Sequence, residues 1–285
     1  MHHRLLRLLA ASLLVAMSAA QAEVTLIHAG ELLAVPGKPP AREMTIIVED
    51  GRITGVQRGF AEVDGAAVID LRDSFVLPGL MDMHVHLQGE LGPRNDSDAL
   101  KMSNQLMQMR SLHFAMKTLT AGFTTVRDVG SSEQEMYAMR DAIERGWVDG
   151  PRIIAAGGVG ITGGHADISG VSPELMEHWT SANVCDGPYD CRRAARNVIK
   201  YGGDLIKITS TGGVMTQRAT GTGQQMEMDE LQEVVRAAAR MGRKVASHAH
   251  EEDGIIAALE AGVASIEHGT YAGPRAIKLF KETGA

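Results

Sequence analysis

The sequence predicts an α/β protein in which a small β-domain precedes a larger parallel sheet. From residue 75 onward, strand-like and helix-like segments alternate in about six units, and this alternation produces parallel strands joined by helices. Before residue 75, short runs with a period of two are separated by Pro and Gly turns, which indicates a small antiparallel β-domain. A chain of 285 residues with 44% hydrophobic residues can bury a sizeable core.

Residues 1–22 are expected to be an export signal that is removed. They begin with the basic stretch MHHRLLR, continue with the apolar run LLAASLLVAM and end in AQA, a small-x-small sequence that suits a signal peptidase. The apolar run is too short to span a bilayer, which needs roughly twenty residues. We therefore expect a periplasmic or secreted protein without a stable membrane anchor, and a retained amphipathic anchor is the alternative.

Residues 23–74 are expected to form the small β-domain. Its strand-like runs are 23–35, 44–57 and 66–73. The sequence Glu49-Asp50-Gly51-Arg52 interrupts the second run and is a hairpin signal.

Residues 75–285 are expected to form the strand–helix array. The expected strands are 75–86, 123–130, 151–158, 204–213, 244–250 and 264–270, and the expected helices are 98–122, 132–146, 191–202, 228–242, 253–262 and 274–284. A long loop is expected between the third strand and the helix at 191–202. Several helices stop at a glycine that can take a left-handed cap, namely Gly122, Gly146, Gly202, Gly242 and Gly262.

The charge pattern limits the classes of partner that the protein can bind. The formal net charge is −7 and no dense Lys/Arg run is present, which argues against a nucleic-acid partner because phosphate binding needs clustered cations. We expect a small-molecule substrate, and association into a homo-oligomer stays open.

The two cysteines, Cys185 and Cys191, are expected to form a disulfide. Gly187 and Pro188 between them supply a turn, and an exported protein meets an oxidising compartment. A second cysteine pair that would complete a metal cluster is absent from the sequence, and two free thiols are the alternative.

Candidate metal ligands stand at the ends of several expected strands. His84 and His86 lie one residue apart, so a strand would point both imidazoles to the same side, as two ligands of one metal or as two solvated side chains. The carboxyl ends of parallel strands gather catalytic groups, and Lys207, His248 and His268 follow this pattern. A lysine amine that captures CO2 becomes a carbamate, an anionic ligand that is able to bridge two divalent metals.

Four ordered motifs carry a resemblance to a known family. VLPGLMDMHVH, DLIKITSTGG, SHAH and IEHGT resemble the metal-dependent amidohydrolase superfamily, in particular its imidazolonepropionase-like and Xaa-Pro dipeptidase-like branch. The resemblance implies a distorted (β/α)8 TIM-type barrel beside a small β-sandwich. It also implies two divalent metal ions, most readily zinc, whose ligands are His84, His86, carboxylated Lys207, His248 and His268.

Three further residues are candidates with open alternatives. His250 follows His248 in the same spacing and competes with it as the ligand from the fifth strand. Glu251 matches a glutamate that moves protons in deaminase and imidazolonase relatives, or it is an acidic helix start. His165, in GITGGHAD, is expected to contact the scissile carbonyl or its neighbour, or to be a plain loop histidine.

The resemblance implies a hydrolase that cleaves a C–N amide bond, in a dipeptide or an N-acyl amino acid, with a hydroxide held between the metals. The aspartate that serves as the general base at the eighth strand of the superfamily has no counterpart here, since about six strand–helix units are present. We therefore expect an incomplete barrel and a C-terminally truncated chain. The alternatives are a one-metal cyclic-amide hydrolase or deaminase of the imidazolonase type, and an inactive metal-binding fragment.

Overall fold

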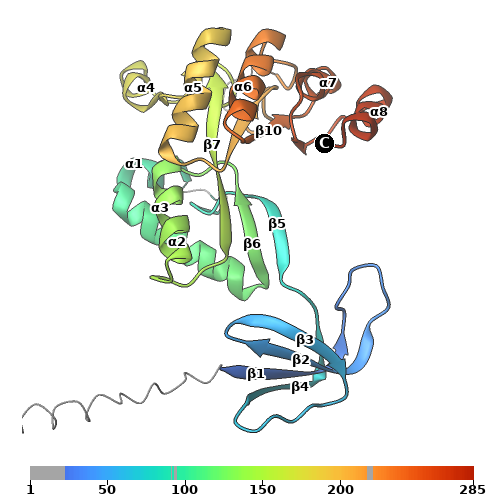
Figure 1. Cartoon of the computed structure of the whole chain (residues 1–285). Helices are drawn as coiled ribbons and strands as arrows, with labels where there is room; N and C mark the ends of the chain where they lie inside the picture. The colour runs from blue at the N-terminus through green and yellow to red at the C-terminus, as the bar shows by residue number, and fades with distance from the viewer. Residues whose placement is uncertain (1–22, 91, 93–94, 217–220) are drawn as a thin grey trace, which may run out of the picture. The chain divides into compact units, whose positions relative to one another are not determined.

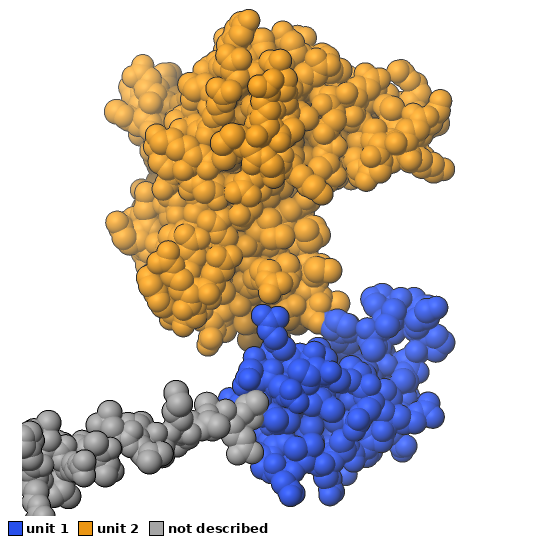
Figure 2. All heavy atoms as spheres, in the orientation of Figure 1, with its two compact units in different colours: residues 1–78 blue, residues 79–285 orange. Residues whose placement is uncertain are grey.

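The computed structural model describes residues 23–90, 92, 95–216 and 221–285, so the expected export signal lies outside the described residues. The chain divides into two compact units, one that ends at Pro78 and one that begins at Gly79 (Figure 2).

The first unit contains a four-stranded sheet in the order β3-β2-β1-β4. Its strands are β1 (Val24–Leu32), β2 (Ala41–Glu49), β3 (Arg52–Arg58) and β4 (Ala67–Val76). The predicted hairpin is confirmed, because Glu49 pairs with Arg52 across an antiparallel β2–β3 pair. Asp50 and Gly51 form the turn with φ angles of 48° and 74°, the left-handed conformation that such a turn requires.

The expectation of a purely antiparallel first domain is wrong at β4. This strand pairs with β1 in parallel, with Ile27 opposite Ile69. Since β2 already occupies one edge of β1, the chain after β3 returns to the other edge and runs in the direction of β1. The described residues of this unit form this one sheet, so the β-sandwich stays a prediction.

The second unit is a parallel sheet whose strands are joined by helices, as the alternation predicts. Its seven strands are in the order β11-β10-β9-β7-β6-β5, with β8 paired to β7, and every pair is parallel. They are β5 (Leu80–Val85), β6 (Phe123–Asp128), β7 (Arg152–Ile161), β8 (Val184–Cys185), β9 (Leu205–Thr209), β10 (Lys244–Ala249) and β11 (Ser265–His268).

The helices of this unit are α1 (Asn95–Lys101), α2 (Asn104–Thr120), α3 (Glu133–Glu144), α4 (Pro173–Trp179), α5 (Pro188–Tyr201), α6 (Met228–Arg240), α7 (Glu252–Ala261) and α8 (Pro274–Thr283). Helices α5 to α8 follow one another along the outside of the sheet (Figure 1). The predicted left-handed glycines are confirmed, with positive φ at Gly122, Gly146, Gly202, Gly242 and Gly262. Within the described residues, every helix is too short or too polar to cross a bilayer.

The expected strand at 75–86 belongs to two strands in different units. β4 ends at Val76 and β5 begins at Leu80. Pro78 has no N–H to donate to a sheet. A Cβ on Gly79 would lie 2.1 Å from Oγ1 of Thr124, so the backbone passes this point where only glycine fits.

Two other segments also differ from the sequence expectation. The expected helix at 98–122 is two helices, because Ser103 caps α2 by accepting a hydrogen bond from the Leu106 N–H at 3.2 Å. The expected long loop after β7 contains α4 and the short strand β8. A helix of two turns and a two-residue strand are too short for periodicity to reveal.

The main core lies between the sheet and helices α5, α6 and α7, and it determines where polar side chains point. Ile206 and Ile208 of β9 are fully buried in this core, with Val198 of α5 and Val234 of α6. Because side chains alternate along a strand, Lys207 faces the opposite side of the sheet. That side carries the candidate site.

The predicted disulfide is present in the structure. Cys185 at the end of β8 is bonded to Cys191 in the first turns of α5, and both are buried. The bridge ties the segment after α4 to the helix that packs on the sheet.

Replacing both cysteines by serine is expected to lower the free energy of unfolding by about 2 kcal/mol, the chain-entropy value for so short a loop. Urea unfolding of oxidised wild type and of the double variant measures the difference. Thiol titration of the denatured wild-type protein, purified from an oxidising compartment, should detect no free thiol. Two titratable thiols in that protein would contradict the bridge.

Candidate metal centre

A pocket of about 640 Å³ lies at the carboxyl ends of the parallel strands. Its lining includes every expected ligand together with two further histidines: His84, His86, His165, Lys207, His248, His250 and His268. The structure therefore brings together side chains that lie far apart in the sequence, from His84 to His268.

The parallel register explains why these side chains meet. Lys207 of β9 is paired with Ala246 of β10, and two residues later Thr209 is paired with His248. His248 is in turn paired with Glu267 of β11. Paired residues of adjacent strands point to the same side of a sheet, so Lys207, His248 and Glu267 share the face opposite the core.

His84 and His86 project together from the end of β5, as the sequence predicts. Their rings are nearly parallel, with centroids 5.4 Å apart and an interplanar angle of 7°. Val85 between them packs with the hydrophobic cluster on the other face. A Cβ on Gly130 would lie 2.2 Å from the His86 ring, so the absence of a side chain at Gly130 leaves room for this imidazole.

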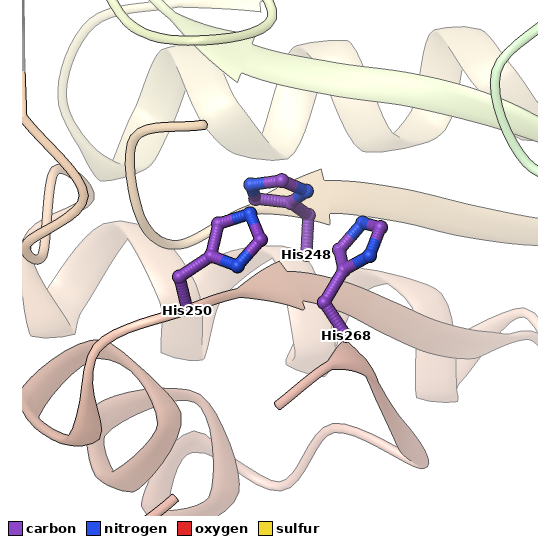
Figure 3. A group of neighbouring side chains, drawn as sticks. All are labelled: His248, His250 and His268. Carbon is purple, nitrogen blue, oxygen red and sulfur yellow. The ribbon is translucent and has the colours of Figure 1, made fainter. Parts of the chain in front are cut away.

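His248, His250 and His268 form a compact triad (Figure 3). Each offers a ring nitrogen, and the three nitrogens lie within 4.8 Å of one another. The structure thus places both His248 and His250 beside His268, and the alternative between them stays open. Hydrogen bonds engage one nitrogen of His248, to the Gly212 carbonyl at 3.2 Å, and one of His250, to the Thr270 hydroxyl at 2.8 Å, which leaves the other nitrogen of each ring for a ligand.

His268 reaches this triad through an unusual backbone conformation. Its φ is 72°, in the left-handed region that few residues other than glycine adopt. In a regular strand His268 would point away from the face that Glu267 occupies. The left-handed turn instead brings the His268 ring to 4.9 Å from that of His84 and 4.7 Å from that of His248. Strain of this kind is concentrated at functional sites.

Lys207 is a buried amine that faces the pocket. Its exposed fraction is 7%, and burial lowers its pKa to about 8. Within the described part of the chain it forms no hydrogen bond or ion pair. On the same face, Oγ1 of Thr209 is buried without a hydrogen-bond partner among the described residues. An unpaired amine with a lowered pKa has the properties that carbamate formation from CO2 requires, since only the neutral amine is nucleophilic.

The electrostatics of the pocket favour neutral imidazoles. Burial lowers the pKa of His248 to about 3 and that of His268 to about 4, and it also lowers the pKa of His86 and His165. A histidine must be neutral to bind a metal. The donor set therefore fits a divalent metal such as zinc, which favours imidazole nitrogen and carboxylate-like oxygen.

An ion-pair network behind the histidines was missed from the sequence. Nδ1 of His84 lies 2.9 Å from a carboxylate oxygen of Glu267, and the other oxygen accepts a hydrogen bond from Arg127 at 2.6 Å. Although burial opposes ionisation of Glu267, hydrogen bonds from His84 and Ser265 and the charge of Arg127 lower its pKa to about 2. Such a carboxylate fixes the orientation of a metal-binding imidazole.

Asp128 is a second residue that sequence reasoning missed. It is 2% exposed and accepts hydrogen bonds from the backbone N–H groups of Leu87, Gly130 and Ser131. These bonds join the chain after β5 to the chain after β6, and so hold His86 against Gly130. Its position at the end of the FTTVRD strand was the available signal, because chemistry gathers at the carboxyl ends of such strands.

The two further catalytic candidates, His165 and Glu251, occupy different surroundings. His165 lines the pocket, with its ring 4.4 Å from that of His248, and its Nδ1 lies 2.6 Å from the Thr216 hydroxyl. Glu251 is not among the lining residues; it directly precedes α7, and its carboxylate accepts a hydrogen bond from the Thr222 hydroxyl at 2.7 Å. The structure thus brings His165 to the histidine cluster and engages Glu251 elsewhere.

Comparison with known proteins agrees with this geometry. Ochratoxinase of Aspergillus niger is 30% identical over 290 residues, which cover 95% of this chain and 59% of that protein. A solved Xaa-Pro dipeptidase with bound methionine in the active site is 39% identical, with a TM-score of 0.85 over 92% of this chain and 66% of that one. A prolidase complexed with N-methylphosphonate-L-proline is 31% identical, with a TM-score of 0.79 over 92% of this chain and 65% of that one.

These relatives are longer than the present sequence, which spans 59% of the curated protein and 66% of the dipeptidase chain. The sequence profile of the amidohydrolase family matches residues 75–284, which contain every candidate ligand. The predicted resemblance is confirmed, and the chain belongs to the amidohydrolase family.

Proposed function

We propose that this protein is a metal-dependent hydrolase that cleaves a C–N amide bond in a small substrate, a dipeptide or an N-acyl amino acid. The observation that carries the proposal is the convergence of His84, His86, Lys207, His248 and His268 on one pocket. The dipeptidase and the prolidase among the structural relatives support this class of substrate.

The proposed centre holds two divalent ions, most readily zinc. His84 and His86 would bind one ion, His248 and His268 the other, and Lys207, as a carbamate, would lie between them. The chemistry that two such ions supply is the activation of a water and the polarisation of a substrate carbonyl. The contact between Nδ1 of His84 and the Glu267 carboxylate keeps the His84 ring oriented, and burial keeps His248 and His268 neutral near pH 7.

His165 is the residue of this chain best placed to act on substrate. Its ring is held by the Thr216 hydroxyl, and its backbone N–H donates to Gln225 at 2.9 Å. Burial lowers its pKa, so that at neutral pH it is an uncharged imidazole. In that form it can donate a hydrogen bond to the substrate carbonyl, or accept a proton from the attacking water and deliver it to the leaving amine.

Export remains part of the proposal. A disulfide forms and persists in an oxidising compartment, and Cys185 and Cys191 are bonded. This supports a periplasmic or secreted protein.

Protein purified in the presence of zinc and bicarbonate is expected to bind about two ions per chain, because the pocket offers ligands for two. Elemental analysis, combined with the protein concentration, gives the number of zinc ions per chain. His113→Asn is a matched control, since His113 lies on α2 outside the pocket lining and should leave the ratio unchanged. One ion or none in the wild-type protein would count against the two-metal centre.

Lys207→Ala is expected to lower kcat/KM for dipeptide hydrolysis by at least about 100-fold. Mutating residues that only orient metal ligands already costs up to about 100-fold in activity, and Lys207 is itself a proposed ligand. Lys200→Ala, at the exposed end of α5, is the control and should retain wild-type turnover. Zinc content and kinetics are measured on the same preparations. Wild-type turnover by Lys207→Ala would show that the bridging role is wrong.

A further inference from the structure

The pocket contains a carboxylate that the proposed metal centre does not use. Besides the imidazoles and Lys207, its lining includes Glu133 and Asn183. Glu133 is the first residue of α3, shortly after β6, and Asn183 immediately precedes β8. Neither belongs to a motif that the sequence analysis identified.

Glu133 is held in place by neutral donors. One carboxylate oxygen accepts hydrogen bonds from the Gly158 N–H at 2.9 Å and from the Asn183 amide at 3.0 Å, and the other lies 3.1 Å from that amide. Asn183 is 4% exposed, and its own oxygen accepts a hydrogen bond from Asn197 at 2.8 Å. The half-buried carboxylate is therefore oriented by a backbone N–H and by the buried Asn183 amide.

Within the described residues, Glu133 forms no ion pair with a cationic side chain. Burial raises its pKa, as expected where water is partly excluded and a compensating charge is missing. A carboxylate that has lost part of its hydration is normally paired with a cation, and the Glu133 oxygen that bonds only Asn183 retains a free lone pair. Glu133 thus presents to the pocket a carboxylate without a cationic partner, and one of its oxygens can still accept a hydrogen bond.

Gly158 links this carboxylate to the metal ligands. It donates its N–H to Glu133 and is paired in register with Lys207 on the adjacent strand, at the ~4.8 Å spacing of neighbouring strands. Gly157 faces Val198 and Tyr137, so Gly158 faces the pocket, and a Cβ built on it would meet no atom within 4 Å. Open space therefore lies beside Lys207, next to the backbone group that holds Glu133.

We propose that Glu133 binds the free α-ammonium group of the substrate and so selects dipeptides over N-acyl amino acids. This inference rests on the proposed amide hydrolysis. In a dipeptide, the ammonium group is attached to the carbon next to the scissile carbonyl, so a carbonyl held near Lys207 places the ammonium close to the Gly158 backbone. An N-acyl amino acid has no cation there and leaves Glu133 unmatched.

Alanyl-leucine and propionyl-leucine test the proposal, because they differ only in that the second has hydrogen in place of the ammonium group. The wild-type protein, loaded with zinc, is expected to hydrolyse alanyl-leucine with the higher kcat/KM. Glu133→Gln should lower kcat/KM for alanyl-leucine by about 10- to 100-fold, mainly through KM, since hydrogen bonds to charged groups contribute this much. The same substitution should leave kcat/KM for propionyl-leucine nearly unchanged.

Glu135→Gln is the matched control, since it makes the same change on the same helix outside the pocket lining, and it should affect neither substrate. Circular dichroism establishes that each variant is folded. Equal wild-type turnover of the two substrates overturns the proposal without any variant. An equal loss on both substrates in folded Glu133→Gln also overturns it, because it would indicate a general structural role.

Calorimetric binding separates this inference from the proposed function. If the wild-type protein hydrolyses neither compound, hydrolysis of this substrate class is wrong, and the affinities of the zinc-loaded protein for the same two compounds decide the role of Glu133. Tighter binding of alanyl-leucine that is lost in Glu133→Gln supports an ammonium site. Equal affinities overturn it.

Discussion

The interaction on which the site most depends is the ion pair between Arg127 and Glu267. These residues belong to β6 and β11, which lie near opposite ends of the sheet order, and their charged groups are 2.6 Å apart. Arg127 also donates a hydrogen bond to the Met83 carbonyl of β5, and Glu267 contacts His84 of the same strand. The pair therefore links β11, at one end of the sheet order, to β6 and β5 at the other end. Because the two ends are tied together across the interior face, the sheet curves around one pocket and its histidines meet.

Burial then gives the assembled side chains their chemistry. The same exclusion of water that makes the Arg127–Glu267 pair strong holds His248 and His268 in the neutral form and makes the Lys207 amine easier to deprotonate. The proposed site is thus a set of electron-pair donors that is prepared before any metal binds. Glu133 is the exception, a carboxylate on the same pocket that is matched only by neutral donors.

The sequence was sufficient to predict the parallel sheet and the hairpin at Asp50-Gly51, because these depend on local periodicity and strand alternation. The candidate ligands at the ends of β5, β9, β10 and β11 were predicted from strand ends together with the family resemblance. It did not reveal that residues 75–86 divide between two strands, since a continuous apolar run conceals the break at Pro78. Arg127, Glu267 and Glu133 also escaped prediction. Their roles arise from partners 25 to 183 residues away, and alternation along one strand carries no information about such distant contacts.

The left-handed conformation of His268 restricts how this site can change. Most side chains in that conformation cost roughly 1–2 kcal/mol relative to glycine, with asparagine and aspartate tolerated best. A replacement at position 268 must therefore satisfy the backbone before its donor atom matters, and glycine, the easiest replacement for the backbone, offers no donor. The backbone thus restricts which residues position 268 can accept, whereas the other non-glycine residues that line the pocket have no positive φ and are free of this constraint.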